Sequence, residues 1–366
     1  MKFLREKLRS FAIGVLRRVG RAPETRGIAA ATLEGLLHTA DDLRDLANRP
    51  VRDYPELGGP RTAQRVSMRG DCVLISARFR SGSTLLWNLF RHVEGVTAYF
   101  EPFHPRLRLP RESRGGAIDA THRHVDDYWR EYDAIGNIDR IYRVEWHSER
   151  LFLDARRHEP EIKSYLETLI GRAPGRPVLQ FNRADFRLPW LARAFPNASI
   201  VHLYRHPRDQ WLSFLKDWKA FPPDGDLATF FADHDHYSIR EWVEDLNPSF
   251  PFLDWSQCRH PYAMHYLLWK LSYLFGQRYA HFAVSYERLI GSPRAEIERL
   301  FAAIGVENAD IEALSRLVEP QPRDKWRAYA DEDWFREQES RCEEILCDAL
   351  GASAREFRAA TTLDRR

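Results

Sequence analysis

The chain of 366 residues is 44% hydrophobic, so it is long and apolar enough to bury a sizeable core. Its 55 Lys and Arg residues nearly balance its 53 Asp and Glu residues, and the formal net charge of +2 argues against a protein that mainly coats nucleic acid. No stretch approaches the roughly 20 apolar residues that a membrane-spanning helix requires, so we expect a soluble protein.

The N-terminal segment, residues 1–27, is strongly basic. Its eight Lys and Arg residues and two Glu residues give it a charge of +6, which leaves −4 on the rest of the chain. One helical face of residues 2–19 carries the apolar residues Leu4, Leu8, Phe11, Val15 and Val19. This pattern predicts a basic amphipathic helix, which either touches an anionic membrane surface or forms a surface helix or frayed tail. The apolar run over residues 11–16 is too short for a signal peptide, so we expect no cleavage.

Residues 28–70 are predicted to form a helical and loop-like extension, and residues 71–366 a single domain of alternating strands and helices. Strands are predicted over residues 72–77, 97–100, 178–181, 200–204 and 282–286. Helices are predicted over residues 84–93, 188–195, 208–219, 262–275 and 295–304, the last of them ending at Gly305. Because the strands lack strict alternation, they indicate an α/β fold with a mostly parallel sheet of about five strands and helices on both faces. Two inserts, at about residues 105–177 and 221–261, are expected to be helical and to carry recognition or form a lid.

The segment Arg78–Thr84 follows the first predicted strand and opens a helix. Unpaired backbone N–H groups at the helix start suit an anion, and Gly82 permits close approach to the backbone. Arg80, with Arg78, adds positive charge. The segment lacks the first glycine and the lysine of the loops that bind nucleoside triphosphates, Gly-x-x-x-x-Gly-Lys-Ser/Thr. An ordinary capped helix is the alternative. Hydroxyl donors are available from Ser81, Ser83 and Thr84.

The segment Tyr204–Ser213 repeats this arrangement after the fourth predicted strand. Arg205 ends the strand, Arg208 follows within one turn, and Ser213 lies one turn into the helix. Arginine can donate bidentate hydrogen bonds to a phosphate, and the serine can reach the same anion. A solvated Arg-Pro-Arg turn is the alternative. Two such loops predict a ligand with anionic groups at both ends.

Together these segments resemble the sulfotransferase family that uses 3′-phosphoadenosine 5′-phosphosulfate (PAPS). In that family a loop of the form Arg/Lys-Ser/Thr-Gly-Ser/Thr-Thr binds the 5′-phosphosulfate, and Arg80–Thr84 matches it. A later Arg-x-Pro-Arg/Lys-Asp-x-x-x-Ser binds the 3′-phosphate and is matched by Arg205–Ser213, and Tyr286 matches a tyrosine near the adenine. The resemblance covers residues 71–330 in patches. It implies a P-loop-like three-layer fold, PAPS as donor and 3′,5′-ADP as product.

The sequence also departs from the family pattern. Arg80 stands where the cytosolic members have lysine, which is more similar to the carbohydrate, tyrosyl-protein and bacterial branches. Phe79 stands where proline is frequent. No Lys-x-Gly-x-x-Gly-Asp-Trp segment occurs near the C-terminus. Arg323–Trp326 resembles the shorter Lys-Trp element of the Golgi-type and bacterial branches, which makes Lys325 a candidate for binding the nucleotide and leaves open which groups close over it.

Sulfuryl transfer needs a base for the proton of the acceptor, and two residues compete for that role. Glu101, in a segment that resembles the Phe/Tyr-Glu-Pro of carbohydrate and tyrosyl-protein sulfotransferases, is favoured because neighbouring aromatic residues would raise its pKa. His104 is the competing base, since imidazole titrates near neutrality. Alternatively, Glu101 only orients Arg80 or Arg78.

Some residues that suggest metal or redox chemistry are better explained otherwise. The groups His122–Asp127 and Asp233–His236 contain metal-ligand residue types, but both lie in polar inserts, and we expect solvated loops and no bound metal. The cysteines have no disulfide-like or metal-like spacing and fit a reducing compartment. They are Cys72, Cys258, Cys342 and Cys347.

The sequence therefore predicts a PAPS-dependent sulfotransferase that acts on an acceptor hydroxyl of a carbohydrate, phenol, lipid or peptide. We expect it in the cytoplasm, with peripheral contact of residues 2–19 to the inner face of the membrane as a further possibility. A nucleotide-dependent kinase on a related fold and a non-catalytic PAPS-binding or anion-binding protein remain the alternatives.

Overall fold

The structure is a computed structural model that describes residues 72–115, 118–119, 121–307 and 309–350. The predictions for residues 1–27 and 28–70, including the amphipathic helix and its membrane contact, lie outside the described residues. Within the described ranges, no helix is both long and apolar enough to cross a membrane.

Five parallel strands form one central sheet, as the sequence predicted. They are β1 (Val73–Ala77), β2 (Val96–Phe100), β3 (Arg176–Phe181), β4 (Ser199–Tyr204) and β5 (Phe282–Ser285). Their order is β2-β3-β1-β4-β5, and β1 pairs with β3 on one side and β4 on the other. The chain thus changes direction across the sheet at β1 and β4, so the loops that follow these two strands border the crevice where open α/β sheets bind ligands.

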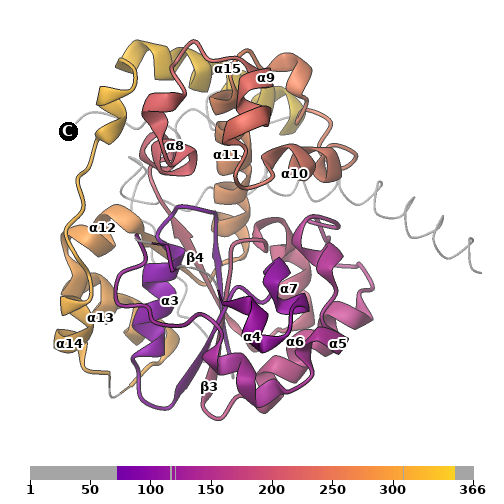
Figure 1. Ribbon diagram of the computed structural model, residues 1–366, viewed down its shortest axis with the longest axis vertical. Helices are drawn as coiled ribbons and strands as arrows, with labels where there is room; N and C mark the ends of the chain where they lie inside the picture. Colours follow the sequence, from indigo (N-terminus) through magenta and orange to yellow (C-terminus); the bar gives the residue numbers. More distant parts are fainter. Residues whose placement is uncertain (1–71, 116–117, 120, 308, 351–366) are drawn as a thin grey trace, which may run out of the picture.

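Helices cover both faces of the sheet (Figure 1). On one face, α3 (Ser83–Arg91) packs with α13 (Pro293–Ile304), where the rings of Phe90 and Phe301 lie 5.1 Å apart. On the other face, α11 (Pro261–Tyr279) contacts β4 and α7 (Leu188–Ala194). The three-layer α/β architecture expected from the sequence is therefore confirmed.

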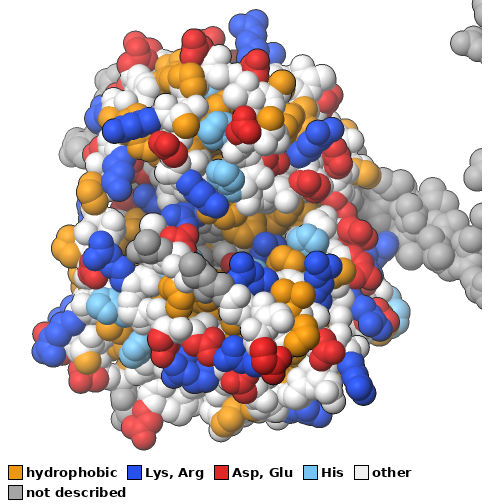
Figure 2. Space-filling view, viewed as in Figure 1, with side chains coloured by type: hydrophobic (Ala, Val, Ile, Leu, Met, Phe, Trp, Pro, Cys, Tyr) orange, Lys and Arg blue, Asp and Glu red, His pale blue; other side chains and the backbone are white. Residues whose placement is uncertain are grey.

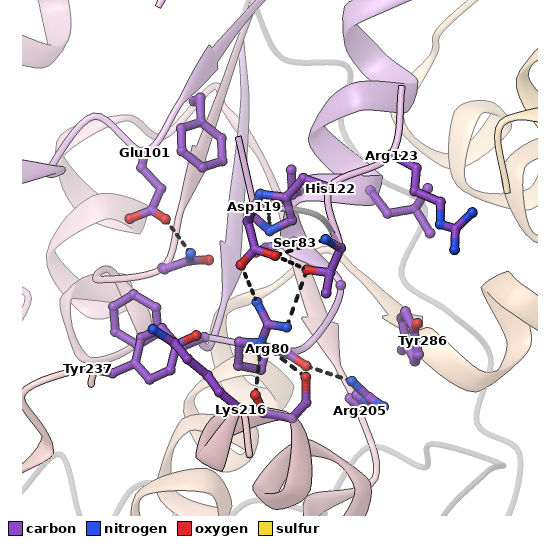
Figure 3. A pocket seen from close by; sticks show the side chains of 18 of the residues that line it. Arg80, Ser83, Glu101, Asp119, His122, Arg123, Arg205, Lys216, Tyr237 and Tyr286 are labelled. Carbon is purple, nitrogen blue, oxygen red and sulfur yellow. Dashed lines mark hydrogen bonds and ion pairs between the residues drawn. The ribbon is translucent and has the colours of Figure 1, made fainter. Parts of the chain in front are cut away.

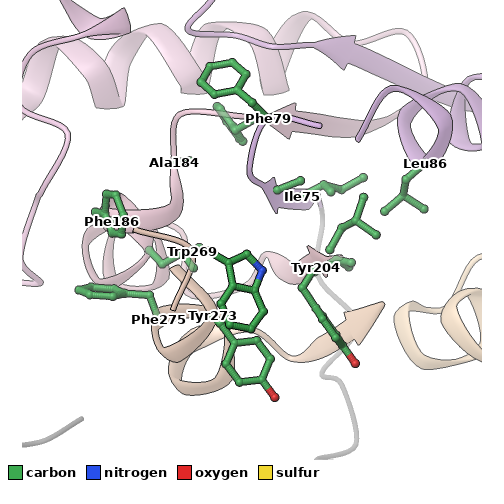
Figure 4. Close-up of a cluster of buried hydrophobic side chains, with 14 of the residues drawn as sticks. Ile75, Phe79, Leu86, Ala184, Phe186, Tyr204, Trp269, Tyr273 and Phe275 are labelled. Atoms are coloured by element: carbon green, nitrogen blue, oxygen red, sulfur yellow. The ribbon is translucent and has the colours of Figure 1, made fainter. Parts of the chain in front are cut away.

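The sheet is buried on both faces, which explains why its strands lack alternation. Every residue of β1 and β4 is buried. Around β1 the core continues through Leu86 on one side and through the aromatic residues of α11, including Trp269 and Phe275, on the other (Figure 4). This core holds the carboxyl ends of the strands, and the loops that follow them, in fixed positions.

The two predicted inserts contain short helices. The first holds η2 (Pro105–Arg108), α4 (Arg111–Arg114), η3 (Arg130–Ile135), α5 (Ile138–Ile141), η4 (Val144–His147) and α6 (Pro160–Arg172), followed after β3 by η5 (Asp185–Arg187). The second holds α9 (Leu227–Thr229), η7 (Phe230–His234), α10 (Ile239–Leu246) and η8 (Trp255–Gln257), preceded by α8 (Pro207–Leu215) and η6 (Trp218–Ala220). After β5 come α12 (Tyr286–Gly291), α13, α14 (Ile311–Arg316), η9 (Lys325–Ala328) and α15 (Glu332–Leu350).

Helix ends show where local sequence and tertiary structure differ. Gly305 adopts φ 64° at the end of α13, as predicted for a left-handed stop. The helix predicted over residues 208–219 ends earlier, at Leu215, because Lys216 adopts φ 61°. That break turns the Lys216 side chain to the cleft described below.

Candidate active site

A cleft of about 970 Å³ opens at the carboxyl ends of the strands. Residues from both anion-binding loops, from the end of β2 and from both inserts line it. Figure 2 shows this face of the molecule hollowed near its middle, with Lys, Arg and His side chains around the hollow. The fold therefore brings the two loops that the sequence singled out to one cavity.

The first loop makes a tight turn that only glycine fits at one position. Gly82 has φ 94°, and a Cβ atom built on it would lie 2.3 Å from Cδ2 of Tyr286. Arg80 also has a positive φ, 65°. The loop thus folds directly against the tyrosine ring, which leaves its backbone open to the cleft.

Helix α3 presents free amide groups to the cleft. No side chain caps the helix. The first helical hydrogen bond is donated by the N–H of Leu86 to the Gly82 carbonyl, at 3.1 Å. The preceding N–H groups have no acceptor within the helix, and Ser83 and Thr84 both line the cleft. A helix start with free N–H groups favours an anion at this point.

Arg80 is held at the centre of the cleft by contacts from other segments. Its Nε donates to the hydroxyl and carbonyl oxygens of Ser213, at 3.0 and 3.1 Å. Its Nη1 donates to Asp119 at 3.3 Å. The serine from the second loop therefore positions the arginine of the first.

Arg205 links the two loops directly. Its Nη1 donates to the backbone oxygen of Arg80 at 3.0 Å, and its guanidinium carbon lies 4.6 Å from the centre of the Tyr286 ring. Its Nε is buried without a hydrogen-bond partner. A buried, unpartnered guanidinium N–H that borders a cleft fits an anionic ligand.

Three residues predicted to bind the ligand do not line the cleft. Arg78 is buried, pairs with Asp185 at 3.3 Å, and lies over the ring of Trp242. The hydroxyl of Ser81 donates to the Arg78 carbonyl at 2.7 Å. Arg208 makes two hydrogen bonds of 2.8 Å to the Glu339 carboxylate. In these contacts the three residues hold the loops in place.

The segment Arg323–Trp326 lies beside the second loop. The Asp209 carboxylate accepts from the backbone N–H groups of Asp324, at 3.0 Å, and Trp326, at 3.3 Å. Lys325 lines the cleft between these two anchors. Its position therefore depends on an acidic residue of the second motif.

Glu101 is buried at the end of β2 and lines the cleft. Its carboxylate accepts hydrogen bonds from Asn182 and from Arg183, with which it forms an ion pair. Burial raises the pKa of this carboxyl, while the charge of Arg183 and the two hydrogen bonds act in the opposite direction. Its partner is thus Arg183, and neither Arg80 nor Arg78.

His104 also lines the cleft, but its ring bonds to the backbone and, among the described residues, forms no ion pair like that of Glu101. Its Nδ1 accepts from the backbone N–H of Arg106 at 3.1 Å, so the proton of the neutral ring is on Nε2. Burial, together with the charges of Arg183 and Arg106, lowers the pKa of His104 well below its ordinary range. The imidazole is therefore a neutral donor, which fits a hydrogen-bonding role better than that of a base.

A family model described as "Sulfotransferase family" matches residues 73–310, about two thirds of the chain and all five strands. The chain belongs to the sulfotransferase family. It is therefore a sulfotransferase enzyme by membership, and the kinase alternative loses its support.

Two solved structures similar to this sulfotransferase are also sulfotransferases. One is a sulfotransferase domain from the curacin biosynthetic pathway, with 13% identity, coverage of 80% of this chain and 99% of that one, and a TM-score of 0.38. The other is a sulfotransferase from Alicyclobacillus acidocaldarius, with 15% identity, coverage of 78% and 98%, and a TM-score of 0.35. No curated protein matches the sequence.

The histidine-rich segments of this sulfotransferase hold loops together in the described parts of the chain. His122 contacts the Thr84 hydroxyl at 3.2 Å and the Tyr128 hydroxyl at 2.5 Å. His124 pairs with Glu319 at 3.2 Å. Asp235 caps α10 through the N–H groups of the first helical turn. Among the described residues, no three His, Cys, Asp or Glu side chains gather as metal ligands.

The sequence analysis missed Asn182 and Arg183, which contact Glu101. Both directly follow β3, and polar residues just after a buried parallel strand are a signal that could have identified them. It also missed Tyr237 and Lys216, which line the cleft from the second insert and from the end of α8. No local pattern marks either residue, because their place depends on how the insert folds back.

Proposed function

We propose that this sulfotransferase uses PAPS as its donor and transfers the sulfuryl group to an acceptor hydroxyl, with release of 3′,5′-ADP. The observation that carries the proposal is the contact of the two anion-binding loops: Arg205 donates to the Arg80 backbone at the ends of adjacent strands. Two anion-binding loops that contact each other in this way fit a single ligand with anionic groups at both ends. PAPS supplies an activated sulfuryl group on a phosphate.

The residues at this end of the cleft fit such a donor. For the 5′-phosphosulfate we propose Arg80, Gly82, Ser83 and Thr84, because free N–H groups and hydroxyls meet there. For the 3′-phosphate we propose Arg205, whose Nε is buried and unpartnered, with Ser213. For the adenine end we propose Tyr286, which packs against Gly82 and the Arg205 guanidinium, with Lys325 beside it in the cleft lining.

Two side chains are proposed to act in the transfer itself. Arg80 holds positive charge where negative charge gathers as the leaving group departs, and Ser213 keeps its guanidinium in place. Glu101 takes the proton of the acceptor hydroxyl, since its burial raises its pKa toward a useful range. His104 donates a hydrogen bond from Nε2 and does not act as the base.

Transfer of radioactive sulfate from PAPS to a broad set of sugars, phenols, lipids and peptides tests the proposal. We expect labelled product from the wild type and a loss of about 100-fold or more in Arg80→Ala, the size expected for one charged transition-state contact. Arg294→Ala is the matched control, because Arg294 is exposed on α13 and outside the cleft. Equal turnover by Arg80→Ala and the wild type would refute the assignment of Arg80.

We further propose, on the arginine form of the first loop, that the chain lies nearer to the carbohydrate, tyrosyl-protein and bacterial branches. A cytoplasmic site of action is also proposed. It is supported by Cys258 and Cys342, which are buried thiols outside any disulfide in the described part of the chain.

A further inference from the structure

A row of cationic and aromatic side chains leads away from Glu101 along one wall of the cleft. Arg183, the ion-pair partner of Glu101, lies with its guanidinium carbon 4.7 Å from the centre of the Phe79 ring. The Phe79 ring in turn lies 5.0 Å from that of Tyr237. The ammonium of Lys216 lies 5.6 Å from the Tyr237 ring, and all five residues line the cleft.

This wall lies opposite the proposed donor site. In Figure 3, Glu101, Tyr237 and Lys216 lie on one side of Arg80, whereas Arg205 and Tyr286 lie on the other. An acceptor must approach the transferring group from the side away from the leaving phosphate, because the displacement is in line. The cationic and aromatic wall is therefore the acceptor side of the cleft.

The cations of this wall have spare binding capacity. Lys216 is exposed and forms no ion pair with any described residue. Arg183 gives only Nη1 to Glu101, and its Nε is buried without a hydrogen-bond partner. Arg106, which lines the cleft near His104, forms no ion pair with an acidic residue in the described ranges.

The acidic residues of the cleft cannot neutralise these charges, since each has another partner. Asp119 binds Arg80, Glu319 binds Arg123, and Asp209 binds the backbone of the segment 324–326. Glu101 forms an ion pair with Arg183 and with no other cation among the described residues of the cleft. The acceptor side thus keeps an excess of positive charge over two aromatic rings.

We infer that the acceptor of this sulfotransferase is a small hydroxyl compound with an anionic group, a carboxylate, sulfate or phosphate, that binds between Lys216 and Arg183 over the rings of Phe79 and Tyr237. The inference rests on the proposed function, because it assigns the acceptor side of the same cleft. The rings receive the apolar or planar part of the acceptor, and the two cations receive its charge. The bound anion also competes with Glu101 for Arg183, which loosens the ion pair that holds the base.

Matched compounds that differ only in charge test this inference. The probes are 4-hydroxyphenylacetate and its neutral amide, 4-hydroxyphenylacetamide, titrated into the full-length protein saturated with 3′,5′-ADP. We expect the carboxylate to bind at least tenfold more tightly and to be the better sulfate acceptor with PAPS. Equal affinity, tighter binding of the amide, or no binding of the carboxylate would overturn the inference.

The variant Lys216→Met removes the charge and keeps an unbranched side chain at this left-handed position. We expect it to abolish the preference for the carboxylate. Lys219→Met is the matched control, because Lys219 is a nearby exposed lysine outside the cleft lining, and it should keep the preference. An unchanged preference in Lys216→Met would also overturn the inference.

Binding of 3′,5′-ADP, measured in the same samples, separates the two possible failures. If the wild type does not bind 3′,5′-ADP, the donor assignment and thus the proposed function are refuted. Normal 3′,5′-ADP binding without the charge preference would refute the acceptor inference alone.

Discussion

Glu101 shows how one residue can be prepared for proton transfer by its surroundings. It directly follows β2 with φ 40°, a backbone conformation that non-glycine residues rarely adopt, and its carboxylate is fixed by Asn182 and Arg183. Burial raises its pKa, whereas the proton on Nε2 of His104 makes that ring a donor. Of the two bases that the sequence left open, the geometry favours Glu101.

Glu101→Gln keeps the shape of the side chain but removes the base. We expect it to lower kcat by about 100-fold or more, the usual contribution of a general base, without weakening 3′,5′-ADP binding. His104→Asn is the comparison, because its amide oxygen can accept from the Arg106 N–H as Nδ1 does, and it should lower kcat by less than about tenfold. The opposite ranking in steady-state assays would make His104 the base.

The same assignment predicts the acid limb of the pH profile. Glu101 must be deprotonated to accept a proton, so kcat/KM falls as the pH drops through its pKa, which burial places above the ordinary value of 4.5. The residual activity of Glu101→Gln should lack this limb. A limb that persists unchanged in that variant would show that another group titrates.

At the scale of elements, the site depends on how the loops after β1 and β4 are anchored. Gln210, on α8, donates to the Phe79 carbonyl at 2.6 Å, and Asp209 fixes the segment 324–326. Arg208 ties α8 to α15 through the buried Glu339 carboxylate, which also accepts from the Tyr262 hydroxyl at 2.6 Å. Several residues of the second motif therefore hold neighbouring segments in place, whereas the resemblance implied that the motif binds the 3′-phosphate.

Gly82→Ala tests the close contact between the first loop and Tyr286. The added Cβ would clash with the ring at a position that is already left-handed, so we expect at least a tenfold loss of 3′,5′-ADP affinity and a lower Tm. Gly136→Ala is the control, because Gly136 has φ 68° but no atom within 4 Å of the added Cβ. It should cost only the backbone strain of a positive φ combined with ψ −141°, about 1–3 kcal/mol by general estimates. Equal effects of the two changes would show that the Tyr286 contact is unimportant.

For the molecule as a whole, the sequence predicted all five strands and the parallel sheet, because apolar runs that alternate with helical patterns are a local signal. It also predicted that residues of both loops, Arg80 and Arg205 among them, would share a site, because the carboxyl ends of parallel strands meet at one edge. It could not predict that Arg78 and Arg208 turn away to Asp185 and Glu339. Their partners lie 107 and 131 residues away in sequence, so only the folded chain brings them together.

The cationic and aromatic wall of the cleft could not be predicted from the sequence for a related reason. Lys216 joins the cleft because α8 ends one turn before its expected end, and Tyr237 because the second insert folds back over Phe79. Both depend on tertiary packing, which no residue spacing encodes. The two anion-binding loops were thus predictable from motifs, whereas the wall that contains Tyr237 and Lys216 required the structure.

Calorimetric titration of 3′,5′-ADP into the purified protein without magnesium, with ATP as comparison, tests whether the two loops bind the sulfuryl donor. We expect micromolar binding of 3′,5′-ADP, little binding of ATP, and loss of 3′,5′-ADP binding in Arg205→Met, whereas Arg294→Met, which changes an exposed arginine outside the cleft, keeps it. Absence of 3′,5′-ADP binding by the wild type, or equal binding by Arg205→Met, would contradict the assignment of the two loops to the sulfuryl donor.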